Sequence, residues 1–181
     1  MQFLPTNISE VVLLKPAVFG DERGFFVETW RDEWLHKLPL ATSFVQDNHS
    51  KSSQGVLRGL HYQLIQAQGK LVRVTQGAVW DVAVDMRRNS PTFGQHVAVE
   101  LSADNKHMLW VPPGFAHGFY TLTDTAEFQY KCTDYYAPAH ERCVRWDDPD
   151  LGIAWPLVAG QAPSVSHKDA AGAAFASAEY Y

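Results

Sequence analysis

At 181 residues, the chain has the length of one domain with a substantial buried core. It is 46% hydrophobic and 19% charged, and its formal net charge of -5 argues against general nucleic-acid binding, which ordinarily needs a basic face. No apolar run approaches the ~20 residues that cross a bilayer, and residues 1–10 lack the basic and apolar segments of a signal peptide. We therefore expect a cytoplasmic protein with neither nucleic-acid nor membrane partners.

Short runs rich in β-branched and aromatic residues recur along the chain and predict strands. In chain order the runs are Val11–Leu14, Phe25–Trp30, Ser43–Asn48, Gly55–Gln63, Leu71–Thr75, Val79–Met86, His96–Leu101, His107–Val111, Phe115–Leu122 and Phe128–Tyr135. Many short strands with frequent turns are typical of a β-sandwich or barrel.

The segments between these runs show few helical signals. Gln76-Gly77 and Ala103–Asn105 are each predicted to close a hairpin. Asp32–Leu38 is the only helical pattern before the alanine-rich segment Ala170–Tyr181, which is predicted to form a peripheral helix or a partly disordered tail. Two polar segments are predicted as loops, 137–142 and 166–169. No repeat or linker divides the chain, so we expect a single domain over residues 1–181.

The segment Gly55–Gln63 is the most informative part of the sequence. It places Arg58 and His61 three residues apart in a run of strand character. Side chains alternate along a regular strand, so these two would point to opposite faces. Gly59 lies between them, and a glycine inside a strand often marks a bulge. A bulge there would bring a guanidinium and an imidazole into one cavity, an arrangement that suits a charged substrate.

The eight histidines raise the question of a metal. Barrels of the cupin type usually hold a metal with a His-x-His pair, a later Glu and a His from a second motif. The second motif is present at 112–117, but His61-Tyr62-Gln63 supplies one imidazole where two are needed. The other histidines lack paired ligand spacing, and the spacing of Cys132 and Cys143 fits no zinc or redox pattern. The sequence therefore predicts a pocket that works without a metal, and two reduced cysteines.

Taken singly, the other polar groups are ordinary. A strand histidine is more often a hydrogen-bonded structural group than a base, although an unperturbed imidazole pKa near ~6.5 suits proton transfer. Tyr130 and Tyr136 have the same parity, yet tyrosines in sheets usually pack. Lys70 opens a strand, where a lysine is normally solvated. Gln46 and Asn48 share a strand face, which is compatible with reading an amide edge or with simple exposure.

Together these motifs are much more specific. The chain contains, in order, the segments Asp21–Glu28, Gln46–Ser50, Val56–His61, Pro113–Phe119, Tyr130–Tyr136, Trp146–Pro149 and Ser166–Asp169. This ordered set resembles the dTDP-4-dehydrorhamnose 3,5-epimerase family. The resemblance covers about residues 3–170 and leaves 171–181 as a peripheral tail.

The resemblance implies a fold and a reaction. The implied fold is all-β, a cupin-type double-stranded β-helix (jelly roll) with short peripheral helices. The implied activity is that of an isomerase without a metal or other cofactor. It would invert C3 and C5 of dTDP-4-keto-6-deoxy-D-glucose on the route to dTDP-L-rhamnose, for carbohydrate biosynthesis that includes lipopolysaccharide. Both carbons adjoin the C4 ketone, so each proton can be removed only if the enolate oxygen is stabilised.

Four residues match the family's catalytic positions. His61 matches the base that abstracts the proton, and Asp169 matches the carboxylate that orients it. Lys70 matches the cation near the C4 oxygen, where one well-placed donor is typically worth ~3–4 kcal/mol. Tyr130 matches the acid that returns a proton to the opposite face, which makes the outcome an inversion.

Nine further residues match the family's substrate-binding positions. Those expected near the diphosphate or its sugar are Arg23, Arg58 and Lys168. Those expected near the nucleotide are Gln46, Asn48 and Glu28. His117 matches a sugar-pocket contact, Tyr136 a stacking aromatic and Glu141 a further polar contact. The family is dimeric with strand exchange near the N-terminus, so the resemblance also implies a homodimer in which part of each site comes from the partner.

Three alternatives stay open on sequence alone. One is a related enzyme that inverts only C3 or only C5 of another dTDP-4-keto-deoxysugar. Another is a non-catalytic nucleotide-sugar binding module, against which the pair of His61 and Tyr130 argues, because a binder needs neither a base nor an acid. The third is a metal-dependent cupin oxygenase.

Overall fold

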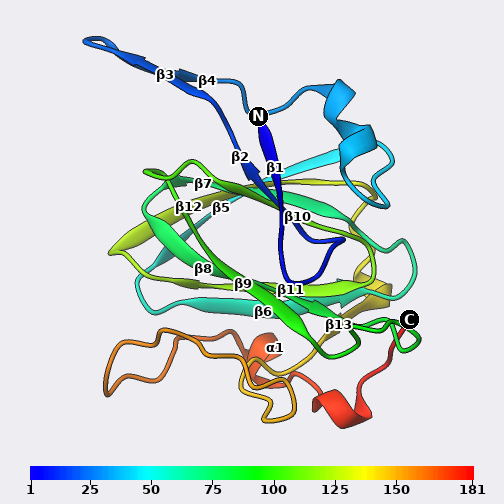
Figure 1. Cartoon of the computed structure of the whole chain (residues 1–181). Coiled ribbons are helices and arrows are strands. Elements are labelled where there is room, and N and C mark those ends of the chain that lie inside the picture. Colours follow the sequence, from blue (N-terminus) through cyan, green and yellow to red (C-terminus); the bar gives the residue numbers. More distant parts are fainter.

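The computed structural model describes all residues 1–181 and consists mainly of strands (Figure 1). The strands are β1 (Gln2–Pro5), β2 (Val12–Lys15), β3 (Val18–Asp21), β4 (Gly24–Val27), β5 (Gln46–Ser53), β6 (Leu57–Gln63), β7 (Lys70–Gln76), β8 (Ala78–Asp85), β9 (His96–Ser102), β10 (Met108–Val111), β11 (Phe115–Thr121), β12 (Thr125–Cys132) and β13 (Glu141–Cys143). The helices are short: η1 (Asp32–Lys37), η2 (Pro138–His140), α1 (His167–Ala170) and η3 (Phe175–Ser177). None of these helices combines the length and the apolar character needed to cross a lipid bilayer.

Two antiparallel sheets face each other and form the body of the protein. The six-stranded sheet has the order β1-β2-β10-β7-β12-β5, and the five-stranded sheet has the order β13-β6-β11-β8-β9. Apolar side chains from both sheets meet between them, among them Val72 and Phe128 from one sheet and Ala83 and Phe119 from the other. This arrangement is a cupin-like jelly roll and confirms the predicted all-β fold class.

The two predicted hairpin turns are real turns, but the prediction that they close hairpins is wrong. Gln76-Gly77 links β7 to β8, and Ala103–Asn105 links β9 to β10. In both cases the two strands belong to different sheets. A short turn signal reports a reversal of the chain and cannot distinguish pairing within a sheet from a crossing between sheets.

Other differences concern polar segments and short strands. The segment 137–142, predicted as a loop, contains η2 and most of β13, and 166–169 contains most of α1 rather than a loop. Ser166 caps α1, because its Oγ accepts a hydrogen bond from the Asp169 backbone N–H at 3.1 Å. Sequence patterns also missed β1 and β3, each only four residues long.

The C-terminal segment covers the outer face of the five-stranded sheet (Figure 1, orange and red). Val82 and Val84 point outward from β8 and pack in a second apolar cluster that includes Phe175 and Tyr181. The Tyr62 hydroxyl donates a hydrogen bond to the Glu179 carbonyl oxygen at 2.6 Å. β8 is therefore covered on both faces, which explains why its sequence is almost continuously apolar.

A bulge in β6 sets the direction of two polar side chains. In the ladder with β11, Arg58 pairs with Phe119 and His61 pairs with His117. On β6, two residues lie between Arg58 and His61, whereas on β11 a single residue, Gly118, lies between His117 and Phe119. The extra residue reverses the alternation, so Arg58 and His61 face the same cavity. The bulge predicted at Gly59 is thus confirmed.

Only glycine fits at position 59. Its φ is +120°, and an added Cβ would lie 2.6 Å from the Gly118 Cα and 2.8 Å from the His117 carbonyl oxygen. Both atoms belong to the backbone of β11 and cannot move without disturbing the ladder.

We expect Gly59→Ala to lower the free energy of unfolding by about 2–4 kcal/mol, because backbone strain and a steric clash add together. Gly160→Ala is the matched control: φ is +75° there, but no atom lies within 4 Å of the added Cβ. That change should cost about 1 kcal/mol. Chemical denaturation measures both values. Equal losses in the two variants would show that the approach of Gly59 to β11 is unimportant.

Candidate active site

A cavity of about 490 Å³ opens between the two sheets. Its walls come from β5, β6, β7, β11, β12 and the segment that leads into α1. The polar residues lining it are Ser50, Arg58, His61, Lys70, His117, Tyr130, Ser164, Ser166, Lys168 and Asp169. Seven of the thirteen residues predicted for the site are among them: Arg58, His61, Lys70, His117, Tyr130, Lys168 and Asp169.

His61 and Asp169 form a hydrogen-bonded pair across the wall of the cavity. His61 Nε2 lies 2.5 Å from Asp169 Oδ1, and the Asp169 side chain is 5% exposed. Burial raises the pKa of Asp169, but hydrogen bonds from His61 and Ser166 outweigh burial and hold that pKa below its ordinary value. An ionised carboxylate can only accept, so Nε2 carries a hydrogen, and in the neutral imidazole Nδ1 keeps a free lone pair. The pair thus presents an imidazole ready to accept a proton.

Tyr130 and Lys70 lie on the other sheet. Tyr130 is on β12, opposite Val72 of β7, and Lys70 is the first residue of β7. Burial raises the pKa of Tyr130 to about 12, so the phenol stays protonated at neutral pH. Burial lowers the pKa of Lys70, an effect that the nearby Cys132, Glu141 and Asp81 oppose. The cavity therefore has a base on one wall and a phenolic acid with an ammonium group on the other.

His117 is held by a carboxylate that sequence reasoning missed. Both carboxylate oxygens of Asp81 lie 3.0 Å from His117 Nε2, and Asp81 is completely buried. Asp81 comes from β8, which pairs with β11 beside it. The available signal was one acidic residue in the middle of the apolar run Val79–Val84, because a buried charge needs a partner.

Arg58 is fixed before any substrate arrives. Its Nε donates a hydrogen bond to Ser52 Oγ at 3.0 Å, and Nη2 donates a longer one to the Lys51 carbonyl oxygen at 3.4 Å. No carboxylate pairs with Arg58. The guanidinium charge therefore remains available to an anion in the cavity.

A chain of polar contacts leads out of the cavity from Lys168. Lys168 Nζ forms an ion pair with Glu141, and the Tyr136 hydroxyl donates a hydrogen bond to Glu141 Oε2 at 2.6 Å. Burial raises the pKa of Glu141, but hydrogen bonds from Lys168 and Tyr136 reverse that effect and hold it below the ordinary value. The Tyr136 backbone N–H donates to Gln46 Oε1 at 3.0 Å, and Gln46 Nε2 donates to Asn48 Oδ1 at 3.2 Å. These five predicted binding residues are thus connected, and the predicted shared face of Gln46 and Asn48 is confirmed.

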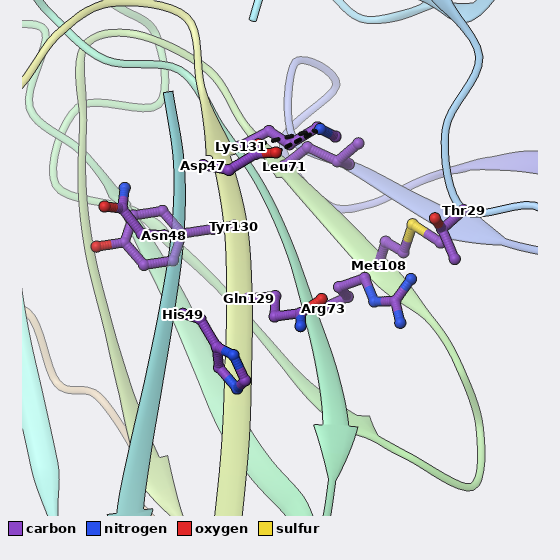
Figure 2. A pocket seen from close by; sticks show the side chains of 10 residues that line it. All are labelled: Thr29, Asp47, Asn48, His49, Leu71, Arg73, Met108, Gln129, Tyr130 and Lys131. Carbon is purple, nitrogen blue, oxygen red and sulfur yellow. Dashed lines mark hydrogen bonds and ion pairs between the residues drawn. The ribbon is translucent and has the colours of Figure 1, made fainter. Parts of the chain in front are cut away.

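A second hollow of about 330 Å³ lies on the other side of the six-stranded sheet (Figure 2). Leu71, Arg73 and Met108 point into it, whereas Asn48 and Tyr130 point away from them on the opposite side (Figure 2). His61, Lys70 and Asp169 do not line it. Tyr130 thus contributes to the walls of both hollows, whereas His61, Lys70 and Asp169 line only the cavity between the sheets.

Arg23 and Glu28 are the two predicted site residues that neither line the cavity nor join the chain of polar contacts from Lys168. Arg23 sits at the turn between β3 and β4, a hairpin that projects from the body of the protein (Figure 1). It pairs with Asp21, and Glu28 pairs with Arg31 at 2.8 Å. Within one chain these residues are separate from the other candidates.

The fold and the cavity define a cupin-like jelly-roll protein with paired acid and base groups on facing walls. A protein-family model described as dTDP-4-dehydrorhamnose 3,5-epimerase matches residues 5–177. The chain is 58% identical over 175 residues to the dTDP-4-dehydrorhamnose 3,5-epimerase of Pseudomonas aeruginosa, an alignment that covers 96% of each chain. The chain therefore belongs to the dTDP-4-dehydrorhamnose 3,5-epimerase family, whose members are isomerases.

Solved structures agree with this membership. The dTDP-6-deoxy-D-glucose-3,5-epimerase of Legionella pneumophila, in complex with dTDP-4-keto-L-rhamnose, superposes with a TM-score of 0.94 at 50% identity, covering 98% of this chain and 94% of that one. A 3'-monoepimerase from Streptomyces bikiniensis, in complex with dTDP-quinovose, has a TM-score of 0.88 at 35% identity, covering 95% and 87%. The fold is thus shared by enzymes that invert two centres and by one that inverts a single centre.

Proposed function

We propose that this protein inverts C3 and C5 of dTDP-4-keto-6-deoxy-D-glucose to give dTDP-4-keto-L-rhamnose, without a cofactor. One observation carries the proposal: an imidazole paired with a carboxylate and a protonated phenol line one cavity from facing sheets. Members of the family at high identity are named for this double inversion. We further propose that residues 1–181 act as one domain in the cytoplasm.

The first step is removal of a proton beside the ketone. In this proposal His61 accepts the proton at Nδ1, and Asp169 stabilises the imidazolium that forms. The electrons move onto the C4 oxygen, where the ammonium group of Lys70 stabilises the enolate. Such a preorganised donor is typically worth ~3–4 kcal/mol of the barrier.

The second step returns a proton to the opposite face of the carbon. Tyr130 comes from the sheet that faces His61. Its high pKa keeps the phenol protonated, so that it can donate this proton to the enolate carbon. Delivery from the face opposite the base converts exchange into inversion. His61 then releases its proton to solvent and Tyr130 takes one up, after which the second carbon undergoes the same sequence of steps.

The diphosphate is held by fixed positive charges in this proposal. Arg58 has no competing carboxylate, and Lys168 lines the same cavity. The ion pair with Glu141 restricts the side chain of Lys168. Tyr136 offers its ring for stacking on the nucleobase at the exposed end of the site. Gln46 and Asn48 supply amide groups for the nucleotide, and His117 contacts the sugar.

The two proton-transfer roles predict different behaviour in deuterium oxide. His61→Ala should lower turnover by ~10²–10⁴-fold and abolish deuterium incorporation, because no base remains. Tyr130→Phe should still exchange protons through His61 but form little inverted product. Mass spectrometry and product stereochemistry measure both outcomes, with dTDP binding to His61→Ala as the control for folding. Near-normal turnover of His61→Ala would show that another residue is the base.

The same experiment distinguishes the proposed double inversion from a second candidate function. The similar 3'-monoepimerase from Streptomyces bikiniensis makes inversion of a single centre the specific alternative. Wild-type protein that incorporates deuterium at both C3 and C5 supports the double inversion, whereas label at one carbon supports the alternative. A non-catalytic binding module would incorporate none.

The lowered pKa of Lys70 predicts how activity falls at alkaline pH. An ammonium with a lowered pKa loses its charge at a lower pH than the ordinary ~10.4. We expect kcat/KM to fall as the pH rises through the lowered pKa of Lys70. Lys70→Arg should move this fall to higher pH, because a guanidinium stays charged. Tyr130 titrates later, at about 12. An alkaline limb that is identical in wild type and Lys70→Arg would remove Lys70 from the mechanism.

We propose that the protein acts as a homodimer in which the β3–β4 hairpin completes the partner's site. Phe19, Phe25 and Phe26 on this hairpin are 66%, 63% and 67% exposed, an unusual apolar surface for a free hairpin. Arg23 and Glu28 match binding positions but lie on or beside the hairpin, away from the cavity of their own chain. A second copy that receives the hairpin accounts for both facts.

Subunit mixing tests this arrangement. Arg23→Ala and His61→Ala should each be impaired alone. In a mixed dimer the intact hairpin of one protomer meets the intact cavity of the other, so random mixing should restore about a quarter of the wild-type sites. Absence of recovery, with mixed dimers verified by differential tags, would show that Arg23 acts within its own chain or not at all.

A further inference from the structure

One group of three possible metal ligands exists in the chain, and it includes the proposed base. It consists of His61, Cys143 and Asp169, whose ligand atoms all lie within 4.8 Å of one another. Asp169 is buried, and the other two residues are partly exposed. The group combines a nitrogen, a sulfur and an oxygen donor.

Backbone pairing holds these three residues together. Cys143 lies directly opposite His61 in the ladder between β13 and β6, so the two side chains share one face of the sheet. The chain that leaves α1 after Asp169 returns to β13, where the Ala173 N–H donates a hydrogen bond to the Cys143 carbonyl oxygen at 2.9 Å. The ligand atoms are therefore held by separate elements that are joined by backbone hydrogen bonds.

This donor set suits a borderline-soft cation. Zn²⁺ binds histidine nitrogen, cysteine sulfur and carboxylate oxygen in tetrahedral geometry, whereas Mg²⁺ and Ca²⁺ prefer oxygen alone. With Zn–N and Zn–O bonds of ~2.0–2.2 Å, the His61 and Asp169 atoms must lie ~3.3 Å apart. They lie 2.5 Å apart in the hydrogen-bonded pair, so a small movement of the two side chains would make room for the ion.

We propose that Zn²⁺ binds His61 Nε2, Asp169 Oδ1 and the thiolate of Cys143, with a water as fourth ligand, and thereby inhibits the protein. The ion is an inhibitor here and not a cofactor. The Cys143 thiol gives its proton to solvent as the Zn–S bond forms. Zinc takes the place of the hydrogen on Nε2, and the neutral imidazole then carries its hydrogen on Nδ1.

This change of tautomer explains how zinc inhibits turnover without blocking the binding of substrate. Nδ1 is the nitrogen that must be free to accept a proton, and in the zinc-bound form it no longer is. Arg58 and Lys168 are not ligands. Zinc should therefore lower kcat while the affinity for dTDP stays near its metal-free value.

Zinc titration of three proteins tests the site: wild type, Cys143→Ser and Cys132→Ser, each normalised to its own metal-free rate. Wild type should be inhibited and should recover when a chelator is added. Cys143→Ser should need at least ~10-fold more Zn²⁺, because the thiolate ligand is missing. Cys132→Ser, which removes the other free cysteine, should behave as wild type. Equal sensitivity of Cys143→Ser and wild type would overturn the proposal.

A spectroscopic readout keeps the metal site independent of the proposed epimerisation. Added Co²⁺ should give wild type a thiolate-to-cobalt charge-transfer absorption in the near ultraviolet, which Cys143→Ser and Cys143→Ala should lack and Cys132→Ser should keep. Circular dichroism verifies that each variant is folded. Cobalt binding without this absorption in folded wild type would overturn the site even if turnover is normal. Absence of turnover with the absorption present would instead count against the proposed reaction.

Discussion

The close approach of β6 to β11 at Gly59 is the constraint on which the site depends. Because only a glycine fits between the two backbones, β6 can accommodate one extra residue at this point. The extra residue turns Arg58 toward the same cavity as His61. Without it, the charge that suits a diphosphate and the base that suits a carbon acid would lie on opposite faces of the sheet. A local irregularity of the backbone thus determines the chemistry of the cavity.

Burial between the sheets then adjusts each group for a different task. It raises the pKa of Tyr130, which keeps a proton available, and it lowers the pKa of Lys70. Asp169 escapes the effect of burial, because hydrogen bonds from His61 and Ser166 favour its ionised form. Burial acts on all of these groups, but their hydrogen-bond partners differ. One cavity can therefore hold a protonated phenol, an ionised carboxylate beside a base, and a cation.

Sequence reasoning predicted the fold class and most of the cavity, and its failures have physical causes. Strands with strong apolar patterns were found, but β13, with the sequence Glu-Arg-Cys, has no such pattern and forms because it pairs with β6. Asp81 was missed because its partner His117 is 36 residues away in the chain. Arg23 was predicted for the site, yet one chain alone does not bring it to the cavity. Patterns report what is local, whereas these features depend on pairing between distant segments.

The crossings between sheets also shape how the protein must fold. β5 pairs with β12, so that His49 meets Glu127 across 78 positions of the chain, and neither strand has a sequence neighbour as its partner in the sheet. Such non-local pairing delays productive contacts, because long loops must close first. The cavity draws on strands from both sheets and on α1, so no folding intermediate that lacks one layer contains it. The cavity is therefore complete only when both sheets and α1 have come together, so activity reports on the joint assembly of these layers.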